Sequence, residues 1–178
     1  MLFETNRLLI REWLIDDLEQ LHKLYADPAI SENIGPALTR EETQHIFENQ
    51  VSKYNLQELE GRYVVLDNQA NIFLGTFLMR PLANDAQVEV GYAIRKSEWD
   101  KGLATELLSN AIPFIFSHTT FKSIYAFTGV ENNRSKRVLD KCGFTEADRF
   151  FEGEEEMCTF FKEKKSIANE AIDSEMHA

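Results

Sequence analysis

The chain has 178 residues, of which 43% are hydrophobic and 28% are charged, and its formal net charge is −11 at pH 7. This length fits one domain, and the apolar content, with 13 phenylalanines, suffices for a packed core and argues against a disordered chain. A general nucleic-acid binder usually carries a basic stripe, so we expect no direct nucleic-acid partner. An acidic surface attracts cationic partners such as amines, although many cytosolic proteins are acidic without that role.

The N-terminal segment and the cysteines indicate a cytoplasmic protein. Residues 1–13, MLFETNRLLIREW, combine two arginines with two glutamates and lack the apolar core of a signal peptide. No apolar run approaches the ~20 residues that a membrane span needs. Cys142 and Cys158 form no C-x-x-C pair, and the histidines are scattered without metal-ligand spacing. We therefore expect free thiols, no membrane association and no metal.

The first elements in chain order are a strand and a helix. The run RLLIRE at 7–12 has the character of a strand, and Asp16-x-x-Glu19 is the pattern of a capping box at the start of a helix. The dipeptide DP at 27–28 should end this helix, which leaves SENIGP at 31–36 as a loop.

A second helix and three strands come next. Thr39-x-x-Glu42 predicts another capping box. The apolar face of this helix is expected to consist of Ile46, Phe47, Val51 and Tyr54. The strands are predicted at 62–67, 72–79 and 88–94, with polar turns between them. These spacings are typical of an antiparallel meander.

The second half of the chain predicts a core helix and a final hairpin. Apolar residues recur at helical spacing from Ala104 to Ile115, and Pro113 should kink or shorten this helix. The later elements are a strand at 123–130, a short helix within 132–144 closed by Gly143 as a left-handed cap, and a hairpin of 145–152 with 157–162. The aromatic residues expected in the core rather than in a substrate wall are Trp13, Tyr25, Phe47 and Tyr92.

The segment SEWDKGLATE at 97–106 joins a predicted strand to a predicted helix through one glycine, Gly102. A helix N-terminus carries roughly half a positive charge and unpaired N–H groups, so such a turn can bind a phosphate. It lacks the GK[ST] of a nucleoside-triphosphate loop and the three glycines of a dinucleotide-binding turn. The residues themselves leave two interpretations open, an ordinary strand–turn–helix or an anion site with Lys101 as its cation.

Three stretches together resemble the GNAT superfamily of N-acetyltransferases, especially the Rim-type branch that acetylates the N-termini of ribosomal proteins. ETNRLLIREWLIDDLEQLHKLYADP at 4–28 is similar to the opening signature of that branch, VEVGYAIRKSEWDKGLATELL at 88–108 to its acyl-CoA segment, and ENNRSKRVLDKCGF at 131–144 to its N-x-x-S-x-R-V-L-x-K-x-G-F element. The resemblance implies one α/β domain over 1–165, whose mostly antiparallel, twisted sheet splays around acetyl-CoA and is flanked by helices. Residues 166–178 are expected to form a polar tail.

The resemblance also implies where the cofactor lies. The turn residues that would surround the pyrophosphate of coenzyme A are Asp100, Lys101, Gly102, Leu103, Ala104 and Thr105. The superfamily pattern begins this turn with Gln or Arg, whereas Trp99 stands there in this chain. The main-chain amides of Ile94, Arg95 and Lys96 would pair with the pantetheine arm where the fourth and fifth predicted strands splay apart. Asn132 would hydrogen-bond the same arm.

Two residues are candidates for catalysis by direct transfer in a ternary complex. Glu89, at the glutamate of the E-I-G-Y motif, is the candidate general base, and the alternative is a solvated glutamate on a strand edge. Many members of the superfamily protonate the leaving thiolate with a tyrosine, but Leu139 occupies that position here. The resemblance implies that Ser135 donates its hydroxyl instead, and the alternative is that Ser135 only caps a helix. Cys142 lacks a nearby histidine in the sequence, so we expect it to pack rather than to form an acyl-enzyme.

The expected acceptor is a primary amine, with a protein N-terminus, ribosomal or similar, as the leading candidate. An α-amine of pKa about 7.8 is neutral in roughly one molecule in seven at pH 7, whereas a lysine of pKa about 10.4 is neutral in roughly one in 2,500. An α-amine therefore needs only a modest base. The alternatives are a small amine (a polyamine, an aminoglycoside or an amino acid derivative) and a non-catalytic CoA-binding module. The sequence leaves open whether the chain forms a homodimer.

Overall fold

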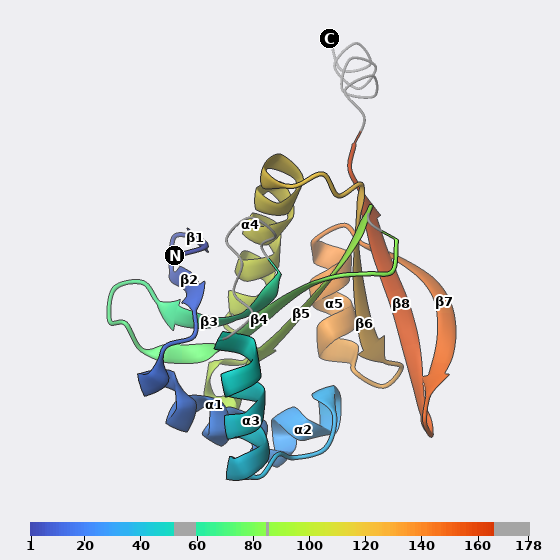
Figure 1. The fold of residues 1–178 in the computed structure, drawn as a ribbon. Coiled ribbons are helices and arrows are strands. Elements are labelled where there is room, and N and C mark those ends of the chain that lie inside the picture. The colour runs from blue at the N-terminus through green and yellow to red at the C-terminus, as the bar shows by residue number, and fades with distance from the viewer. Residues whose placement is uncertain (52–59, 85, 166–178) are drawn as a thin grey trace.

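The structure, a computed structural model, describes residues 1–51, 60–84 and 86–165 (Figure 1). Eight strands form one sheet in the order β1-β2-β3-β4-β5-β6-β8-β7. The strands are β1 (Phe3–Glu4), β2 (Leu8–Glu12), β3 (Gly61–Asp67), β4 (Phe73–Pro81), β5 (Gln87–Ile94), β6 (Ser123–Gly129), β7 (Thr145–Glu152) and β8 (Glu155–Glu163). The helices are α1 (Leu18–Tyr25), α2 (Pro28–Ile34), α3 (Arg40–Val51), α4 (Leu103–His118) and α5 (Asn133–Lys141). The expected mixed α/β domain is confirmed.

The sheet divides between β5 and β6. Every other pair of neighbouring strands is antiparallel, whereas β5 and β6 run parallel and pair only over Gln87–Glu89 and Ser123–Tyr125. Beyond Glu89 and Tyr125 the two strands form no further pairs, and they diverge. The mostly antiparallel sheet with a splay at this point is therefore as predicted.

The two faces of the sheet carry separate cores. Side chains alternate between the faces of a strand, so every second residue of β5 points the same way. Val88, Val90 and Ile94 pack with the apolar residues of α4 and α5, whereas Ala93 packs with those of α1 and α3. Figure 1 shows α3 and α4 on opposite sides of the sheet. This alternation assigns each residue of β5 to the α4–α5 face or to the α1–α3 face.

The N-terminal caps differ in part from the predictions. Thr39 and Glu42 form the expected capping box, since the Glu42 amide donates to Thr39 Oγ1 at 3.2 Å and the Thr39 amide donates to Glu42 Oε2 at 2.7 Å. The predicted box at Asp16 and Glu19 is wrong. Asp17 is the buried residue there, and its carboxylate accepts the Leu14 amide at 2.6 Å and hydrogen bonds from a neighbouring guanidinium.

Residues 31–34 are helical rather than a loop. Pro28 ends α1 as predicted, but it also occupies the first turn of α2, where a missing N–H costs nothing. Asp27 caps this helix by accepting the Ala29 amide at 2.9 Å. On α3, Phe47 is buried as expected, whereas Val51 is 42% exposed and does not belong to the buried face. Tyr54 lies outside the described residues.

The C-terminal half follows the predictions except at Pro113. The helix α4 continues through Pro113 to His118, so the proline does not shorten it. Gly143 follows α5 with a left-handed φ of 74°, as expected, and β7 and β8 form the final hairpin. Residues 166–178 lie outside the described residues. Within the described part of the chain, no helix is both long and apolar enough to cross a lipid bilayer.

Candidate active site

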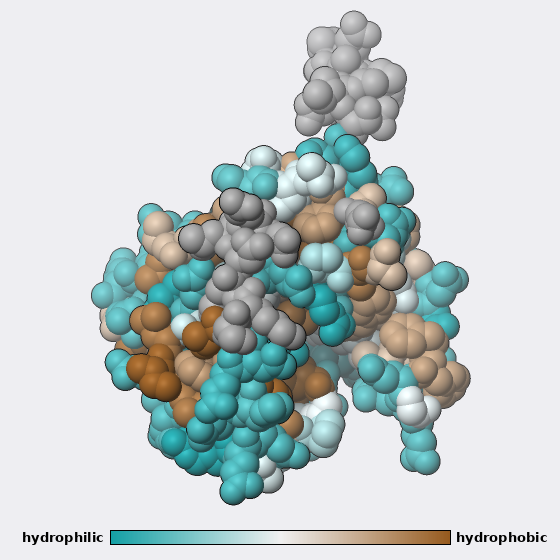
Figure 2. All heavy atoms as spheres, viewed as in Figure 1, coloured by the Kyte–Doolittle hydropathy of each residue, from teal (hydrophilic) through white to brown (hydrophobic). Residues whose placement is uncertain are grey.

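A cleft of about 1820 Å³ opens where β5 and β6 diverge. Its walls come from α2, β4, β5, the turn before α4, the first turns of α4 and α5, and the β7–β8 hairpin. Figure 2 shows this face of the molecule hollowed between the body of the domain and that hairpin. The predicted site residues that line the cleft are Glu89, Ile94, Lys96, Trp99, Asp100, Gly102, Leu103, Ala104, Thr105, Asn132 and Ser135. Arg95 and Lys101 are not among its lining residues.

The N-terminus of α4 opens into the cleft without a side-chain cap. Gly102 is the N-cap residue, and no side chain of the described residues accepts a hydrogen bond there. Asp100 and Gly102 are both left-handed, with φ of 61° and 77°, and this conformation turns the chain sharply into the helix. An uncapped 16-residue helix leaves N–H groups of its first turn available for an anion in the cleft.

A brace from the N-terminal strand region holds this turn from behind. The Glu106 carboxylate accepts hydrogen bonds from Thr5 Oγ1 at 2.6 Å and from Arg7 Nε at 2.6 Å. The same Arg7 guanidinium donates to the Lys101 carbonyl at 3.0 Å. Burial raises the pKa of Glu106, but the hydrogen bonds from Thr5 and Arg7 outweigh it and lower the pKa overall. No local sequence pattern reveals this brace, because Thr5 and Arg7 lie 101 and 99 positions from Glu106.

Trp99 has a structural role that the sequence did not reveal. Its indole Nε1–H donates to the Ile94 carbonyl at 2.6 Å, which ties the turn to the end of β5. The Arg134 guanidinium lies 4.7 Å from the centre of the Trp99 ring and 3.5 Å from the Asp100 carboxylate. The tryptophan thus connects the turn to the strand, and through its ring to α5.

Lys101 does not provide the cation expected for an anion site. Its ammonium donates to the Glu98 carboxylate at 2.9 Å, and Arg95 donates to the same carboxylate at 3.2 Å. The hydrogen bond from Lys101 is the largest of the influences that lower the pKa of Glu98. The charge of Lys101 is therefore directed to Glu98, and Lys101 itself is not among the residues that line the cleft.

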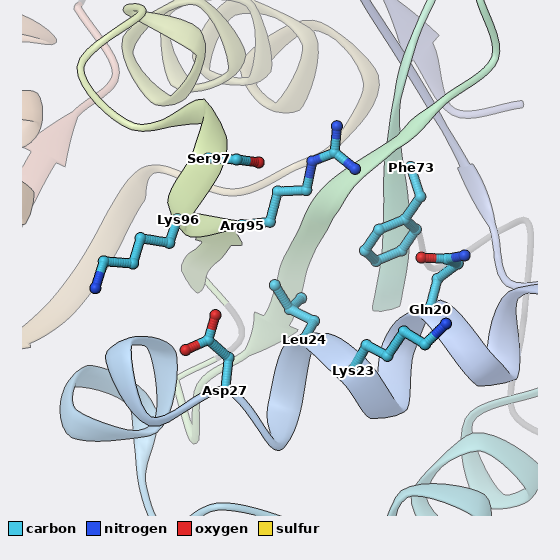
Figure 3. A pocket seen from close by; sticks show the side chains of 8 residues that line it. All are labelled: Gln20, Lys23, Leu24, Asp27, Phe73, Arg95, Lys96 and Ser97. Atoms are coloured by element: carbon cyan, nitrogen blue, oxygen red, sulfur yellow. The ribbon is translucent and has the colours of Figure 1, made fainter.

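The main-chain amide of Arg95 is engaged within the sheet, which corrects its predicted role. It donates to the Leu74 carbonyl of β4 at 2.9 Å, so it cannot pair with a pantetheine arm. In an antiparallel ladder the hydrogen-bonded pairs alternate, so the amides of Tyr92 and Ile94 point to the open side where β6 has diverged. The Arg95 side chain lines a separate pocket of about 270 Å³ beside Leu24 and Phe73 (Figure 3).

Glu89 is a buried, paired carboxylate and not a solvated strand-edge residue. It is 9% exposed, and Arg80, its partner across the β4–β5 ladder, donates to Glu89 Oε2 from Nε at 2.9 Å. Because Glu89 is one residue from Val88 and Val90, its side chain lies on the α1–α3 face.

Ser135 lies in the first turn of α5, on the other face of the sheet. The helix cap is Asn132, whose Oδ1 accepts the Ser135 amide at 3.1 Å, so the Ser135 hydroxyl is not used for capping. Ser135 Oγ lies 3.2 Å from the Tyr92 hydroxyl. Leu139 is 1% exposed and belongs to the core, so α5 brings no phenol to this point.

Tyr92 was placed in the core by the sequence, and the structure corrects this. The Tyr92 ring packs against the α4–α5 core, but its hydroxyl reaches the cleft. Trp13, Tyr25 and Phe47 are buried in the core on the other face of the sheet, as expected. Burial raises the pKa of Tyr92 to about 12, and the hydrogen bond with Ser135 acts in the opposite direction. The absence of tyrosine at position 139 was the signal that could have directed attention to Tyr92.

Both cysteines are free and buried, as expected. Burial raises the pKa of the Cys142 thiol, whose Sγ lies 3.5 Å from the Ser109 hydroxyl. A buried thiol with a raised pKa is a poor nucleophile. Cys142 therefore has the packing role predicted for it.

The family described as the acetyltransferase (GNAT) domain matches residues 7–145. The chain therefore belongs to the GNAT acetyltransferases. Among curated relatives, the uncharacterized N-acetyltransferase YoaA of Bacillus subtilis (strain 168) is 27% identical over 145 residues, which cover 80% of this chain and 82% of YoaA.

Two solved structures share the fold. The spermidine N-acetyltransferase of Vibrio cholerae, solved with CoA and spermine, has a TM-score of 0.75 at 21% identity, covering 89% of this chain and 96% of its own. A Salmonella typhimurium acetyltransferase that modifies the N-terminal serine of the 50S ribosomal subunit protein L7/L12 has a TM-score of 0.77 at 14% identity, covering 90% and 97%. At these identities the likeness establishes the fold and not the acceptor.

Proposed function

We propose that this protein transfers the acetyl group of acetyl-CoA to a protein N-terminal α-amine, as Rim-type enzymes do. The observation that carries the proposal is the cleft at the β5–β6 divergence, which has an uncapped helix N-terminus on one face of the sheet and a buried carboxylate on the other. A cofactor that reaches through the gap meets the acceptor at the point where the sheet is open.

The α4–α5 side of the cleft suits a polyanionic cofactor. The first-turn N–H groups of α4 would bind the pyrophosphate, with Gly102 allowing close approach. Arg134, Arg137 and Lys141 of α5 also line the cleft and add positive charge, and Arg134 lies 3.5 Å from Asp100 of this turn. The open amides of Tyr92 and Ile94 would pair with the pantetheine arm. These features support acetyl-CoA as the co-substrate.

The two candidate catalytic residues lie on opposite faces of the sheet. An amine that arrives from the α1–α3 face would give up a proton towards Glu89, directly or through water, as its nitrogen bonds to the thioester carbon. The carbon–sulfur bond then breaks and its electron pair goes to the sulfur, on the side of Ser135. The proton of the amine is thus accepted on one face of the sheet, and the negative charge of the leaving thiolate develops on the other.

The base that the site offers favours an α-amine as the acceptor. Arg80 pairs with the Glu89 carboxylate at 2.9 Å, and a carboxylate is a modest base. An α-amine is neutral in roughly one molecule in seven at pH 7 and needs no stronger base, whereas a lysine costs about 4.6 kcal/mol to deprotonate.

A polyamine is the second candidate, and one observation favours it. The acceptor side of the cleft includes Glu32, Glu131, Glu152 and Glu155, which would attract a polycation. A spermidine N(1)-acetyltransferase of Vibrio cholerae is also 27% identical over 110 residues, covering 57% of this chain.

The test is acetyl transfer from acetyl-CoA to three acceptors at equal concentration. They are a short peptide with a free N-terminus and no lysine, the same peptide with a blocked N-terminus and one lysine, and spermidine. We expect the free N-terminus to give the highest kcat/KM. Preference for spermidine would establish the second candidate. Tight binding of acetyl-CoA without acetylation of any amine would instead define a CoA-binding module.

A further inference from the structure

The Tyr92–Ser135 contact joins two elements at the point where the sheet opens. Tyr92 comes from β5 and its side chain points to the α4–α5 face, while Ser135 comes from the first turn of α5. Their hydroxyl oxygens are 3.2 Å apart, although the residues are separated by 43 positions in the sequence. Both residues line the cleft.

The direction of this hydrogen bond follows from acidity. A phenol is a stronger acid than an aliphatic alcohol and so the better donor, and burial keeps the Tyr92 phenol protonated by raising its pKa to about 12. Tyr92 therefore donates and Ser135 Oγ accepts. The Ser135 amide is held by Asn132 Oδ1 at 3.1 Å, which fixes the serine in the first turn. The Ser135 O–H is then free to donate into the cleft.

We propose that Tyr92 is a positioning residue that directs the Ser135 hydroxyl at the sulfur of coenzyme A as the thioester breaks. The inference rests on the proposed function. As the carbon–sulfur bond breaks, its electron pair moves to sulfur, Ser135 donates a hydrogen bond to the thiolate, and Tyr92 donates to Ser135. An ordinary thiol has a pKa of about 8.5, below that of a phenol, so the pair stabilises the thiolate without transferring its proton. The thiolate takes a proton from water on release.

In this arrangement a strand supplies the tyrosine hydroxyl that the helix often supplies in the superfamily. The position of the usual tyrosine is Leu139, which is 1% exposed and has no hydroxyl to offer at the cleft wall. Tyr92 brings a phenol into the same cleft from β5. It acts through Ser135, so the hydroxyl that contacts the sulfur is aliphatic.

The experiment measures binding and needs no acceptor. Affinities of the whole protein for CoA and for desulfo-CoA are determined by calorimetry from pH 7 to pH 9.5, across the range in which a thiol ionises. If Ser135 donates to sulfur, the CoA to desulfo-CoA affinity ratio rises about tenfold, the effect of one hydrogen bond to a charged acceptor. Ser135→Ala should abolish the rise, and Tyr92→Phe should reduce it at least threefold while leaving the desulfo-CoA affinity unchanged.

Tyr125→Phe is the matched control. Tyr125 lies on β6, and its hydroxyl accepts a hydrogen bond from Gln87 at 3.0 Å outside the cleft. This variant should keep the full rise. An equal rise in the wild type and Tyr92→Phe would overturn the inference, as would a flat ratio in the wild type. If the wild type bound neither ligand, the proposed function would fall as well, so the two failures are distinguishable. A thermal melt of Tyr92→Phe checks that its fold is retained.

Discussion

The two sides of the cleft are built in different ways. The α4–α5 side is contributed largely by two segments that are each continuous in the sequence, 94–105 and 131–141, so short motifs specify it. The α1–α3 side consists of side chains from α2, β4, β5 and the hairpin, which are far apart in the sequence. Main-chain recognition of a phosphate tolerates many side chains, whereas an acceptor is recognised by the side chains themselves. A common cofactor is thus compatible with different acceptors, and the variants below test each side separately.

Glu89→Gln should have the largest effect and should act on the acceptor side alone. Removing a general base typically lowers kcat by about 100-fold to 10,000-fold. We expect kcat with the preferred amine to fall by at least about 100-fold while the calorimetric affinity for acetyl-CoA stays within about twofold. If kcat and the affinity for acetyl-CoA both fall, Glu89 does not act on the acceptor side alone.

Gly102→Glu should disrupt acetyl-CoA binding on the cofactor side of the cleft. Glutamate would place a negative charge at the helix N-terminus, and the φ of 77° strains any residue with a Cβ. We expect acetyl-CoA affinity to fall by about 100-fold. Gly153→Glu is the matched control, because Gly153 is also left-handed at 63° but lies at the hairpin turn with open space around it. Intact affinity in Gly102→Glu would contradict the phosphate site.

Arg7→Ala should weaken acetyl-CoA binding by about tenfold. The guanidinium orients the Lys101 carbonyl, and in a trans peptide the following Gly102 N–H points the opposite way. Loss of the brace would allow this peptide to rotate. Arg40→Ala, which removes an exposed ion pair with Glu19, is the control and should bind normally. Equal affinities in both variants would show that the turn needs no support from Arg7.

Glu106→Gln should give the smallest effect, a change in the pH dependence of stability. The pKa of Glu106 is lowered in the folded protein, so its stabilising contribution is present above the unfolded value of about 4.5 and is lost as pH falls through the folded value. The free energy of unfolding of the wild type should therefore exceed that of the variant at pH 6, and the difference should narrow towards pH 3. Urea unfolding at both pH values measures it. A constant difference would mean that charge is not involved.

The sequence predicted the parts of the site that depend on local pattern. Gly102, Asn132 and Ser135 all line the cleft, and local pattern could point to them because strand–turn–helix segments and helix caps are short-range structures. The role of Trp99 could not be predicted, since its acceptor is a main-chain carbonyl that no side-chain pattern identifies. The engagement of the Arg95 amide was missed because it depends on the register of β4 against β5.

Contacts between segments that are distant in the sequence were harder to predict for a related reason. The alternation Val88-Glu89-Val90 left two faces open for Glu89, and only the packing of its neighbours against α4 decided between them. The partner of Tyr92 lies 43 positions away, and no local pattern connects a strand residue to a helix residue at that distance. Likewise Asp17, and not Asp16, faces inward, where its carboxylate accepts a hydrogen bond from the Arg11 guanidinium of β2.

The opening of the sheet between β5 and β6 has a consequence for the order of substrate exchange. A cleft lined by residues from both faces lets the cofactor enter from one side and the acceptor from the other. Under the proposed function, an acceptor on the α1–α3 face would not block the exit of the spent cofactor from the other face. We therefore expect a sequential kinetic mechanism in which either product can leave first, which product-inhibition kinetics would test.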